Sequence, residues 1–263
     1  MNLRLDVAYD GRPFHGFARQ RDVRTVQGDL EASLVRVLRT DIATAVAGRT
    51  DAGVHAIGQV VSVPDLPDDI DPVALRNALN ANLAPYISVW AISPATDDFH
   101  ARFSARSRTY VYAILTGDVP DPFLAQTSLY HPKELDVAAM NEAAGHLAGH
   151  HDFSSFGRVP EPGASAERVL FELRCTRDGR LIRVRARANA FIQQMVRALV
   201  GTLLHVGVGK IDPGEVPSIL ERRDRSLAGP VAPPHGLCLV SVEYDEGWKA
   251  PFRPRGPHVS GGG

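Results

Sequence analysis

The N-terminal part of the chain combines two hydrophobic periods, one typical of strands and one typical of helices. Every second residue of Leu3–Tyr9 is apolar, which predicts a half-buried strand. Apolar residues then follow at the spacing of one helix face, with Thr25 as the N-cap: Val26, Leu30, Leu34, Val37 and Leu38. A second helix is predicted after Asp71-Pro72, and strands are predicted at 42–47, 59–63 and 87–92.

A similar order of elements returns in the second half of the chain. A strand is predicted at 108–115, with Tyr110 and Tyr112 on one face, and a helix is predicted after Asp136. The later elements are a strand at 169–175, a hairpin turn at Asp178-Gly179, a strand at 182–188, a long helix face from Phe191 to Leu204, a short helix after Asp212-Pro213 and a strand at 238–243.

This repeated β-α-β-β-α-β order predicts an α+β fold with two ferredoxin-like halves side by side and a central cleft. The first half spans 1–105 and the second spans 106–246, with the crossover near 93–107. A Pro/Gly-rich tail, 247–263, follows them.

The composition is typical of an ordinary soluble protein and does not indicate a particular ligand. Of the 263 residues, 44% are hydrophobic and 22% are charged, as in ordinary soluble proteins, and the formal net charge is -1. A surface for nucleic acid must therefore come from local clustering of arginine, and Arg183, Arg185 and Arg187 on one strand face are candidates. The alternative is a solvated sheet face. The N-terminus is charged and no run reaches membrane-spanning length, so we expect a cytoplasmic protein.

The sequence gives no pattern for a metal or a cofactor. Cys175 and Cys238 lie in apolar runs, which favours a buried reduced pair. His55, His100 and His150-His151 lack ligand spacing. Because a Walker loop and a dinucleotide fingerprint are also missing from the sequence, we expect neither a metal nor a cofactor.

One polar stretch between two predicted strands carries the candidate chemistry: Gly48-Arg49-Thr50-Asp51-Ala52-Gly53-Val54-His55. Its two glycines allow a sharp turn and a close approach to a ligand. Arg49 would keep Asp51 ionised and oriented, and such a carboxylate can act as a nucleophile. The alternative is a simple turn, in which Asp51 caps the backbone and Arg49 only solvates it.

This stretch resembles the signature of the tRNA pseudouridine synthase A family, and the resemblance covers nearly the whole chain. The other matching motifs are Tyr9-Asp10-Gly11, Gly16-Phe17, Arg19-Gln20, Thr25-Val26-Gln27, 80–83, 98–104, the Tyr110/Tyr112 strand, 152–156, Asn189-Ala190-Phe191 and Met195-Val196-Arg197. The chain departs from the family at Phe17, where Trp is frequent, and at 164–168, a loosened version of a family loop.

The resemblance implies roles for particular residues. Asp51 would be the catalytic nucleophile, and Tyr110 would stack on a flipped base, with Tyr112 next in line. The loop 98–104 would enter the RNA as a wedge through Phe99, His100, Arg102 and Phe103. Its alternative is a loop pinned by two buried phenylalanines. Arg197 would lie beneath the catalytic pocket in position to pair with Asp51, or else at the surface of its helix.

The resemblance also implies a reaction and partners. The expected reaction is isomerisation of uridine to pseudouridine at positions 38, 39 and 40 of the tRNA anticodon stem-loop, by a homodimer. No group enters from outside in this reaction, which agrees with the expected absence of a cofactor. The alternatives are a non-catalytic RNA-binding module and a pseudouridine synthase that acts on another RNA.

Overall fold

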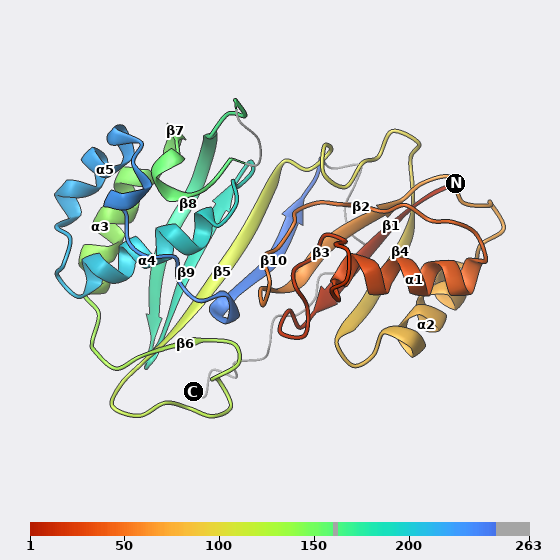
Figure 1. The fold of residues 1–263 in the computed structure, drawn as a ribbon, viewed down its shortest axis with the longest axis horizontal. Coiled ribbons are helices and arrows are strands. Elements are labelled where there is room, and N and C mark those ends of the chain that lie inside the picture. Colours follow the sequence, from red (N-terminus) through yellow and green to blue (C-terminus); the bar gives the residue numbers. More distant parts are fainter. Residues whose placement is uncertain (160–162, 246–263) are drawn as a thin grey trace.

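One continuous mixed sheet of ten strands runs through the whole molecule in the computed structural model, which describes residues 1–159 and 163–245 (Figure 1). The strand order is β4-β1-β3-β10-β5-β9-β8-β7, with β2 added to β3 and β6 added to β5. The strands are β1 (Asn2–Tyr9), β2 (Ala45–Val46), β3 (His55–Val63), β4 (Ile87–Ala95), β5 (Ser107–Thr116), β6 (Leu129–His131), β7 (Gly149–Asp152), β8 (Glu167–Asp178), β9 (Leu181–Ala188) and β10 (Leu237–Glu243).

The last strand joins the two halves of the chain. β10 pairs parallel with β3, through Cys238 and His55, and antiparallel with β5, through Leu239 and Tyr110. The α+β class is therefore confirmed. Backbone hydrogen bonds of β10 connect the strands of the two halves into one sheet.

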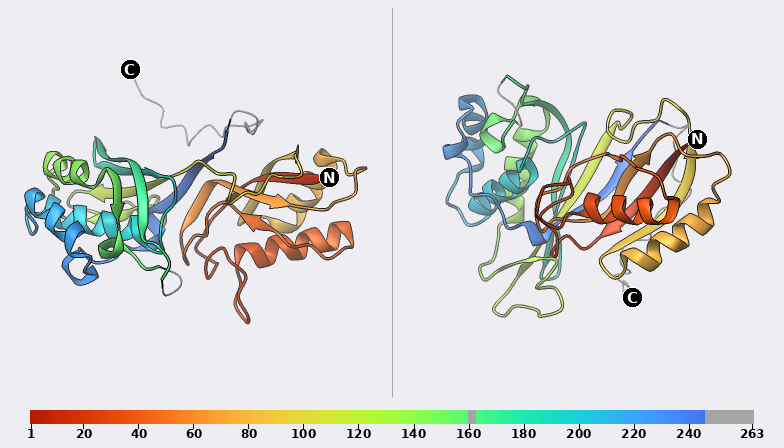
Figure 2. Two further views of the ribbon diagram at one scale, coloured as in Figure 1. Left: turned by 90° about the horizontal axis from the view of Figure 1, so that it is seen from above. Right: turned by 45° about the vertical axis from the view of Figure 1, so that its right-hand side comes forward.

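Within the described residues, five α-helices accompany the sheet, and three of them begin at the predicted caps. Thr25 accepts a hydrogen bond from the Gly28 N–H, Asp71 accepts one from Val73 and Asp136 accepts one from Ala139. The helices are α1 (Val26–Leu38), α2 (Pro72–Leu83), α3 (Val137–Leu147), α4 (Met195–Gly207) and α5 (Val216–Arg222). Figure 2 shows α1 and α2 beside the N-terminal strands and the other three beside the C-terminal strands. Within the described residues, no helix is long and apolar enough to cross a membrane.

A single large hydrophobic core lies between the sheet and the helices and includes side chains from both halves. A second, small cluster comprises Ala47, Val60, Phe99 and Ala101. Val60 precedes Val61 of the main core on the same strand, and successive strand side chains point to opposite faces. The small cluster therefore belongs to the other face of the sheet, where Phe99 covers it.

Some element boundaries differ from prediction. The long helix begins at Met195 instead of Phe191, because Gln193 pairs with Arg158 through two backbone hydrogen bonds and Gln194 is left-handed. The strand predicted at 42–47 shortens to β2, and the short strands β6 and β7 were not predicted. The tail predicted at 247–263 lies outside the described residues.

Candidate active site

Asp51 lies on the loop between β2 and β3, and a chain of hydrogen bonds fixes this loop to the sheet. The Thr50 hydroxyl lies 2.8 Å from the Tyr9 hydroxyl, which accepts a bond of 3.2 Å from Gln59 Nε2. The same amide donates to the Gly48 carbonyl at 2.7 Å. Tyr9 and Gln59 are buried, so the backbone on both sides of Arg49 is held by the sheet.

Two glycines give this loop its shape. Gly53 has φ +77°, a left-handed conformation that favours glycine, and the Val54 N–H closes a turn onto the Asp51 carbonyl at 3.2 Å. Gly16, with φ +100°, packs against the loop so closely that a Cβ there would lie 2.9 Å from the Thr50 carbonyl oxygen. Gly53 thus forms the sharp turn predicted from the sequence, and Gly16 allows a neighbouring segment to pack closely against the loop.

The carboxylate of Asp51 meets an arginine from the other half of the chain. Arg197 Nη1 lies 3.1 Å from Asp51 Oδ2, and the two side chains are 13% and 26% exposed. Arg197 is itself fixed, because its Nε donates to the Ala232 carbonyl at 2.7 Å and its own carbonyl accepts from the Ala232 N–H. The pairing implied by the family resemblance is present, and it leaves Asp51 partly open to a substrate.

Arg49 does not orient Asp51, and this corrects the role that the sequence suggested. Its side chain is exposed and forms no hydrogen bond or ion pair within residues 1–159 and 163–245. The spacing of two residues could not identify the partner, because the guanidinium that meets Asp51 is 146 positions away. Arg49 is thus a free cation on the same loop as Asp51.

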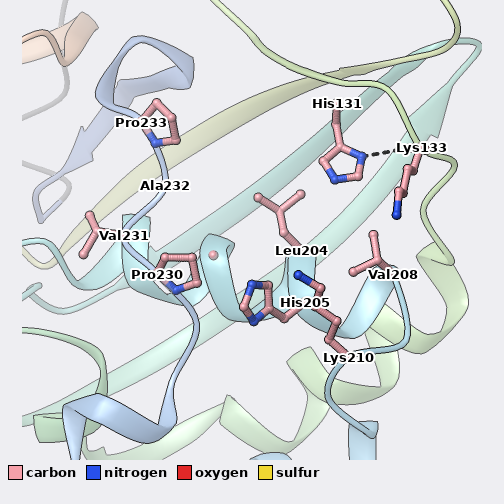
Figure 3. Close-up of a pocket in the computed structure, with 11 residues that line it drawn as sticks. His131, Lys133, Leu204, His205, Val208, Lys210, Pro230, Val231, Ala232 and Pro233 are labelled. Atoms are coloured by element: carbon pink, nitrogen blue, oxygen red, sulfur yellow. Dashed lines mark hydrogen bonds between the residues drawn. The ribbon is translucent and has the colours of Figure 1, made fainter.

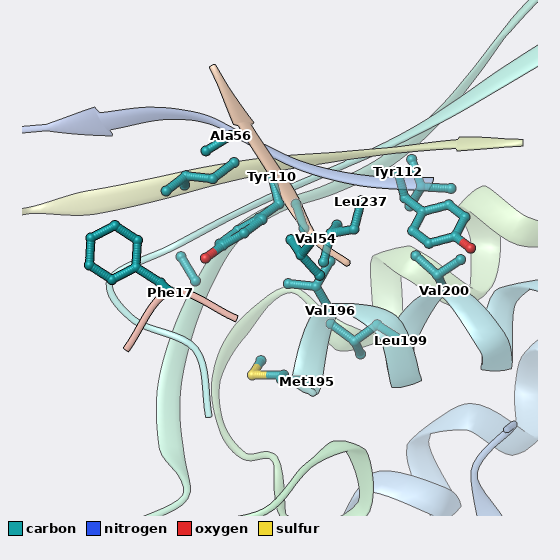
Figure 4. Close-up of a cluster of buried hydrophobic side chains, with 14 of the residues drawn as sticks. Phe17, Val54, Ala56, Tyr110, Tyr112, Met195, Val196, Leu199, Val200 and Leu237 are labelled. Atoms are coloured by element: carbon teal, nitrogen blue, oxygen red, sulfur yellow. The ribbon is translucent and has the colours of Figure 1, made fainter. Parts of the chain in front are cut away.

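Tyr110 and Tyr112 share one face of β5 but have different surroundings (Figure 4). Tyr110 lies between Phe17 and Val54, and its hydroxyl faces Gly48, where a Cβ would lie 3.5 Å away. Its ring is 7% exposed and makes an edge contact with Phe191, and burial raises the pKa of its phenol. A base can stack on this ring only if that cover moves.

Tyr112 has the structural role that the sequence left open. Its ring is fully buried, and its hydroxyl donates to the Pro233 carbonyl at 2.8 Å. In Figure 4 this hydroxyl points away from Tyr110 and toward Val200. Of the two tyrosines, Tyr110 is therefore the one beside the loop of Asp51.

The loop after β4 divides into a buried anchor and an exposed tip. Phe99 is 4% exposed and packs against Tyr244, with ring centroids 5.2 Å apart, so the alternative of a buried anchor holds for this residue. Phe103 is 75% exposed, and its ring lies 4.4 Å from that of His100. The guanidinium of Arg102 lies 5.5 Å from the Phe103 ring, so these three side chains form the exposed tip.

Arg108 was not identified from the sequence, although it connects the loops of the site. It is 7% exposed, and its guanidinium donates five hydrogen bonds of 2.6 to 3.2 Å to the carbonyls of Ala47, Arg102, Ala105 and Asn189. It thereby ties the segment before Asp51 to the exposed tip. A signal was present, because Arg108 shares the alternation of Tyr110 and Tyr112.

The arginine stripe on β9 is matched by acidic side chains. Arg183 lies 3.2 Å from Asp178, Arg185 lies 3.1 Å from Glu172 and Arg187 lies 3.7 Å from Glu243. Neighbouring carboxylates therefore offset its positive charge, which favours the alternative of a solvated sheet face.

His55 connects the loop of Asp51 to two other segments of the chain. Its Nδ1 accepts a hydrogen bond of 3.2 Å from the Gly11 N–H, so Nε2 carries the proton and donates to the Gln126 carbonyl at 3.2 Å. Asp10 Oδ1 lies 3.3 Å from Nδ1. Burial lowers the pKa of His55, which favours the neutral ring.

The cysteines and histidines that could in principle bind a metal do not cluster in the part of the chain that the structure describes. Cys175 and Cys238 are free thiols, and burial raises the pKa of each to about 12. Within the described part of the chain, no group of three or more His, Cys, Asp or Glu residues is arranged to hold a metal ion.

Known proteins of one kind match this chain over most of its length. The family model described as tRNA pseudouridine synthase matches residues 7–104 and 143–245. The tRNA pseudouridine synthase A of Pseudothermotoga lettingae is 41% identical over 239 residues, covering 90% of this chain and 97% of that protein. That of Frankia casuarinae is 47% identical over 249 residues, covering 93% and 89%.

Among solved structures, a Cbf5-Nop10-Gar1 complex aligns with 77% of this chain and 54% of its own at 13% identity. Its TM-score of 0.32 is too low to establish a shared fold, so the assignment depends on the sequence matches. The signature loop that carries Asp51 and the helix that carries Arg197 both fall inside the matched regions. The chain belongs to the tRNA pseudouridine synthase A family.

Proposed function

We propose that this protein isomerises uridine to pseudouridine in tRNA, with Asp51 as the nucleophile. The observation that carries the proposal is the position of the Asp51 carboxylate, which is partly exposed on a rigid loop and paired with Arg197 at 3.1 Å. A fixed, accessible carboxylate of this kind suits nucleophilic catalysis. The names of the matched relatives supply the substrate class.

The proposed reaction rearranges one nucleotide and consumes nothing else. The N1–C1′ bond breaks, the uracil turns within the pocket, C5 bonds to C1′ and the proton on C5 is lost while N1 gains one. Substrate and product contain the same atoms, so the protein has to supply a nucleophile and surfaces that hold the free uracil. Asp51 is the nucleophile in this proposal, and Tyr110 is the stacking surface once its cover has moved.

The exposed tip and Arg49 are the proposed contacts to the RNA around the target base. Phe103 offers a large exposed ring next to His100 and Arg102, which suits a wedge that fills the place of a flipped base. Arg49 is exposed on the catalytic loop, so its guanidinium is available to a phosphate or a base.

The finer features of this proposal come from the family resemblance. They are positions 38, 39 and 40 of the anticodon stem-loop as targets, a homodimer in the cytoplasm, and two ferredoxin-like halves around a central catalytic cleft. Phe123, which is 91% exposed on the segment between β5 and β6, offers an apolar contact of the kind found between subunits.

The test is to incubate unmodified tRNA with the purified protein and to map pseudouridine along the product. We expect pseudouridine at positions 38 to 40 with wild-type protein and none with Asp51→Asn. Binding of tRNA without any pseudouridine would indicate a non-catalytic RNA-binding module. Modification of a different RNA alone would indicate a synthase with another target.

A further inference from the structure

A cavity of about 290 Å³ lies next to helix α4, and Asp51 is not among the residues that line it. Three segments line it: the end of β6 and the residues after it, the C-terminal part of α4 with the turn that follows, and 230–233 (Figure 3). We call it the basic pocket, because its ionisable lining residues are His131, Lys133, His205 and Lys210 and the lining includes no Asp or Glu.

Lysine is rare in this chain, yet two lysines line the basic pocket. Three of the 29 Lys and Arg residues are lysines, and two of those three line this one cavity. Neither Lys133 nor Lys210 forms an ion pair with any residue that the structure describes. In Figure 3 the Lys210 side chain extends toward Leu204 and the Lys133 side chain extends toward Val208, both of which line the cavity.

The carboxylates nearest in sequence are engaged elsewhere. Glu134 lies 2.9 Å from Arg177, and Asp212 accepts a hydrogen bond from the Gly214 N–H. Asp136 caps α3. Two ammonium groups and two imidazoles therefore line one cavity without an anion from the protein, and an anionic ligand would balance the charge of the two lysines.

The polarity of α4 accounts for only part of this arrangement. Cations are favoured at the C-terminus of a helix, which explains His205 in the last turn and Lys210 just beyond it. It does not explain His131 and Lys133, which approach from the segment between β6 and α3. Gly209, with φ +73°, turns the chain so that the Lys210 N–H bonds to the His205 carbonyl, and this brings the lysine back to the pocket.

One wall of the basic pocket also supports the catalytic ion pair. Ala232 lines the pocket, and its backbone bonds in both directions with Arg197, the partner of Asp51. The wall is rigid, because Gly201 of α4 approaches it so closely that a Cβ would lie 1.7 Å from the Pro230 oxygen. A ligand in the pocket would thus be held at a fixed distance from Asp51.

We propose that the basic pocket binds a phosphate group, and that this phosphate belongs to the backbone of the bound tRNA. Lysine ammonium groups bind phosphate oxygens as point charges. Nδ1 of His131 donates to the Lys133 carbonyl at 2.9 Å, so His205 is the imidazole that can add an N–H donor. The second part of the proposal rests on the proposed function, whereas phosphate binding itself does not. A phosphate held there would fix the register of the tRNA relative to the catalytic loop.

The test uses Lys133→Gln, Lys210→Gln and the double variant, with Arg222→Gln as a matched control. Arg222 is exposed in the last turn of α5 and has no ion pair among the described residues, so its loss changes the same charge at another helix end. The first measurement follows His205 by NMR while inorganic phosphate is added at constant ionic strength. Burial and Lys210 lower the pKa of His205, so bound phosphate should raise it, saturably in wild type and not in the double variant.

The second measurement is the dependence of tRNA affinity on salt, which needs no turnover and is therefore independent of the role of Asp51. Each lysine that meets a tRNA phosphate should reduce the slope of log affinity against log salt by about one when replaced, whereas Arg222→Gln should not. A reduced slope supports a tRNA phosphate, and saturable binding of inorganic phosphate with an unchanged slope supports a free phosphate instead. An unchanged slope together with no saturable shift of His205 would overturn the proposal.

Discussion

Arg197 Nη1 lies 3.1 Å from Asp51 Oδ2, although the two residues are 146 positions apart in the chain. The contact joins the signature loop of the N-terminal half to the first turn of α4 in the C-terminal half. Because Arg197 is also fixed to the backbone of Ala232, the direction of the carboxylate depends on both halves. The carboxylate of Asp51 is thus held in place by a residue that the loop itself does not contain.

This arrangement predicts that replacing Arg197 destabilises the protein and that replacing Arg49 does not. Arg197→Ala should lower the melting temperature and reduce turnover on the order of 100-fold, because a misplaced catalytic group is costly. Arg49→Ala should leave the melting temperature unchanged, since Arg49 has no contact to lose within the described residues. Thermal melts and single-turnover rates of the two variants check this. A stable Arg197→Ala protein with full activity would contradict it.

Arg108→Lys should destabilise the fold by at least about 2 kcal/mol, because a lysine cannot replace five hydrogen bonds from one planar guanidinium. It should also reduce the single-turnover rate more than tRNA affinity, because it loosens the loops on both sides of the site. The control is Arg106→Lys, whose guanidinium is exposed and paired with Asp245. Equal effects of the two variants on rate would show that Arg108 does not position the site.

Tyr110→Phe should retain most of the activity, because the ring and not the hydroxyl stacks on the base. Tyr110→Ala should weaken the interaction with the flipped base by about 1–3 kcal/mol. Since burial raises the pKa of this phenol, its ionisation should leave no step in the rate profile between pH 6 and about 9. The measurement is the single-turnover rate of each variant across that range. If Tyr110→Ala matches wild type, the stacking role moves elsewhere.

His55 should make the stability of the fold depend on pH. Its pKa is lowered in the folded state, mainly by burial, so folding favours the neutral ring. Above the unfolded pKa of about 6.5 the ring is neutral in both states, and the fold has its full stability. As the pH falls below 6.5 the unfolded chain takes up a proton that the folded chain does not, so the free energy of unfolding decreases. The free energy of unfolding should therefore decline less steeply below pH 6.5 in His55→Gln than in wild type. Parallel denaturant titrations check this, and identical slopes would exclude His55 as the cause.

The sequence predicted local features such as helix caps, but it did not predict the pairing of strands that are distant in the chain. The caps at Thr25, Asp71 and Asp136 depend on neighbouring residues, and each was predicted correctly. The central place of β10 was not predictable, because its partners β3 and β5 are set by contacts between distant segments.

In the candidate site, too, the sequence predicted local features better than contacts between distant residues. The sequence motif identified Asp51 and its loop, but spacing alone assigned the orienting role to Arg49 instead of Arg197. Arg108 was missed because a charged residue in a strand is ordinarily exposed, and only the tertiary structure shows the four carbonyls around it. Phe99 and Phe103 are equivalent in the sequence, and the fold buries one and exposes the other.

The central claim is that the carboxylate of Asp51 performs the chemistry, and Asp51→Asn tests it most directly. Asparagine keeps the shape of the side chain, and its Oδ1 can still accept a hydrogen bond from Arg197, but it is no nucleophile. We predict a single-turnover rate of pseudouridine formation at least about 1,000-fold below wild type, with tRNA affinity within a few fold of wild type. Pseudouridine formation by Asp51→Asn at an appreciable fraction of the wild-type rate would contradict the account.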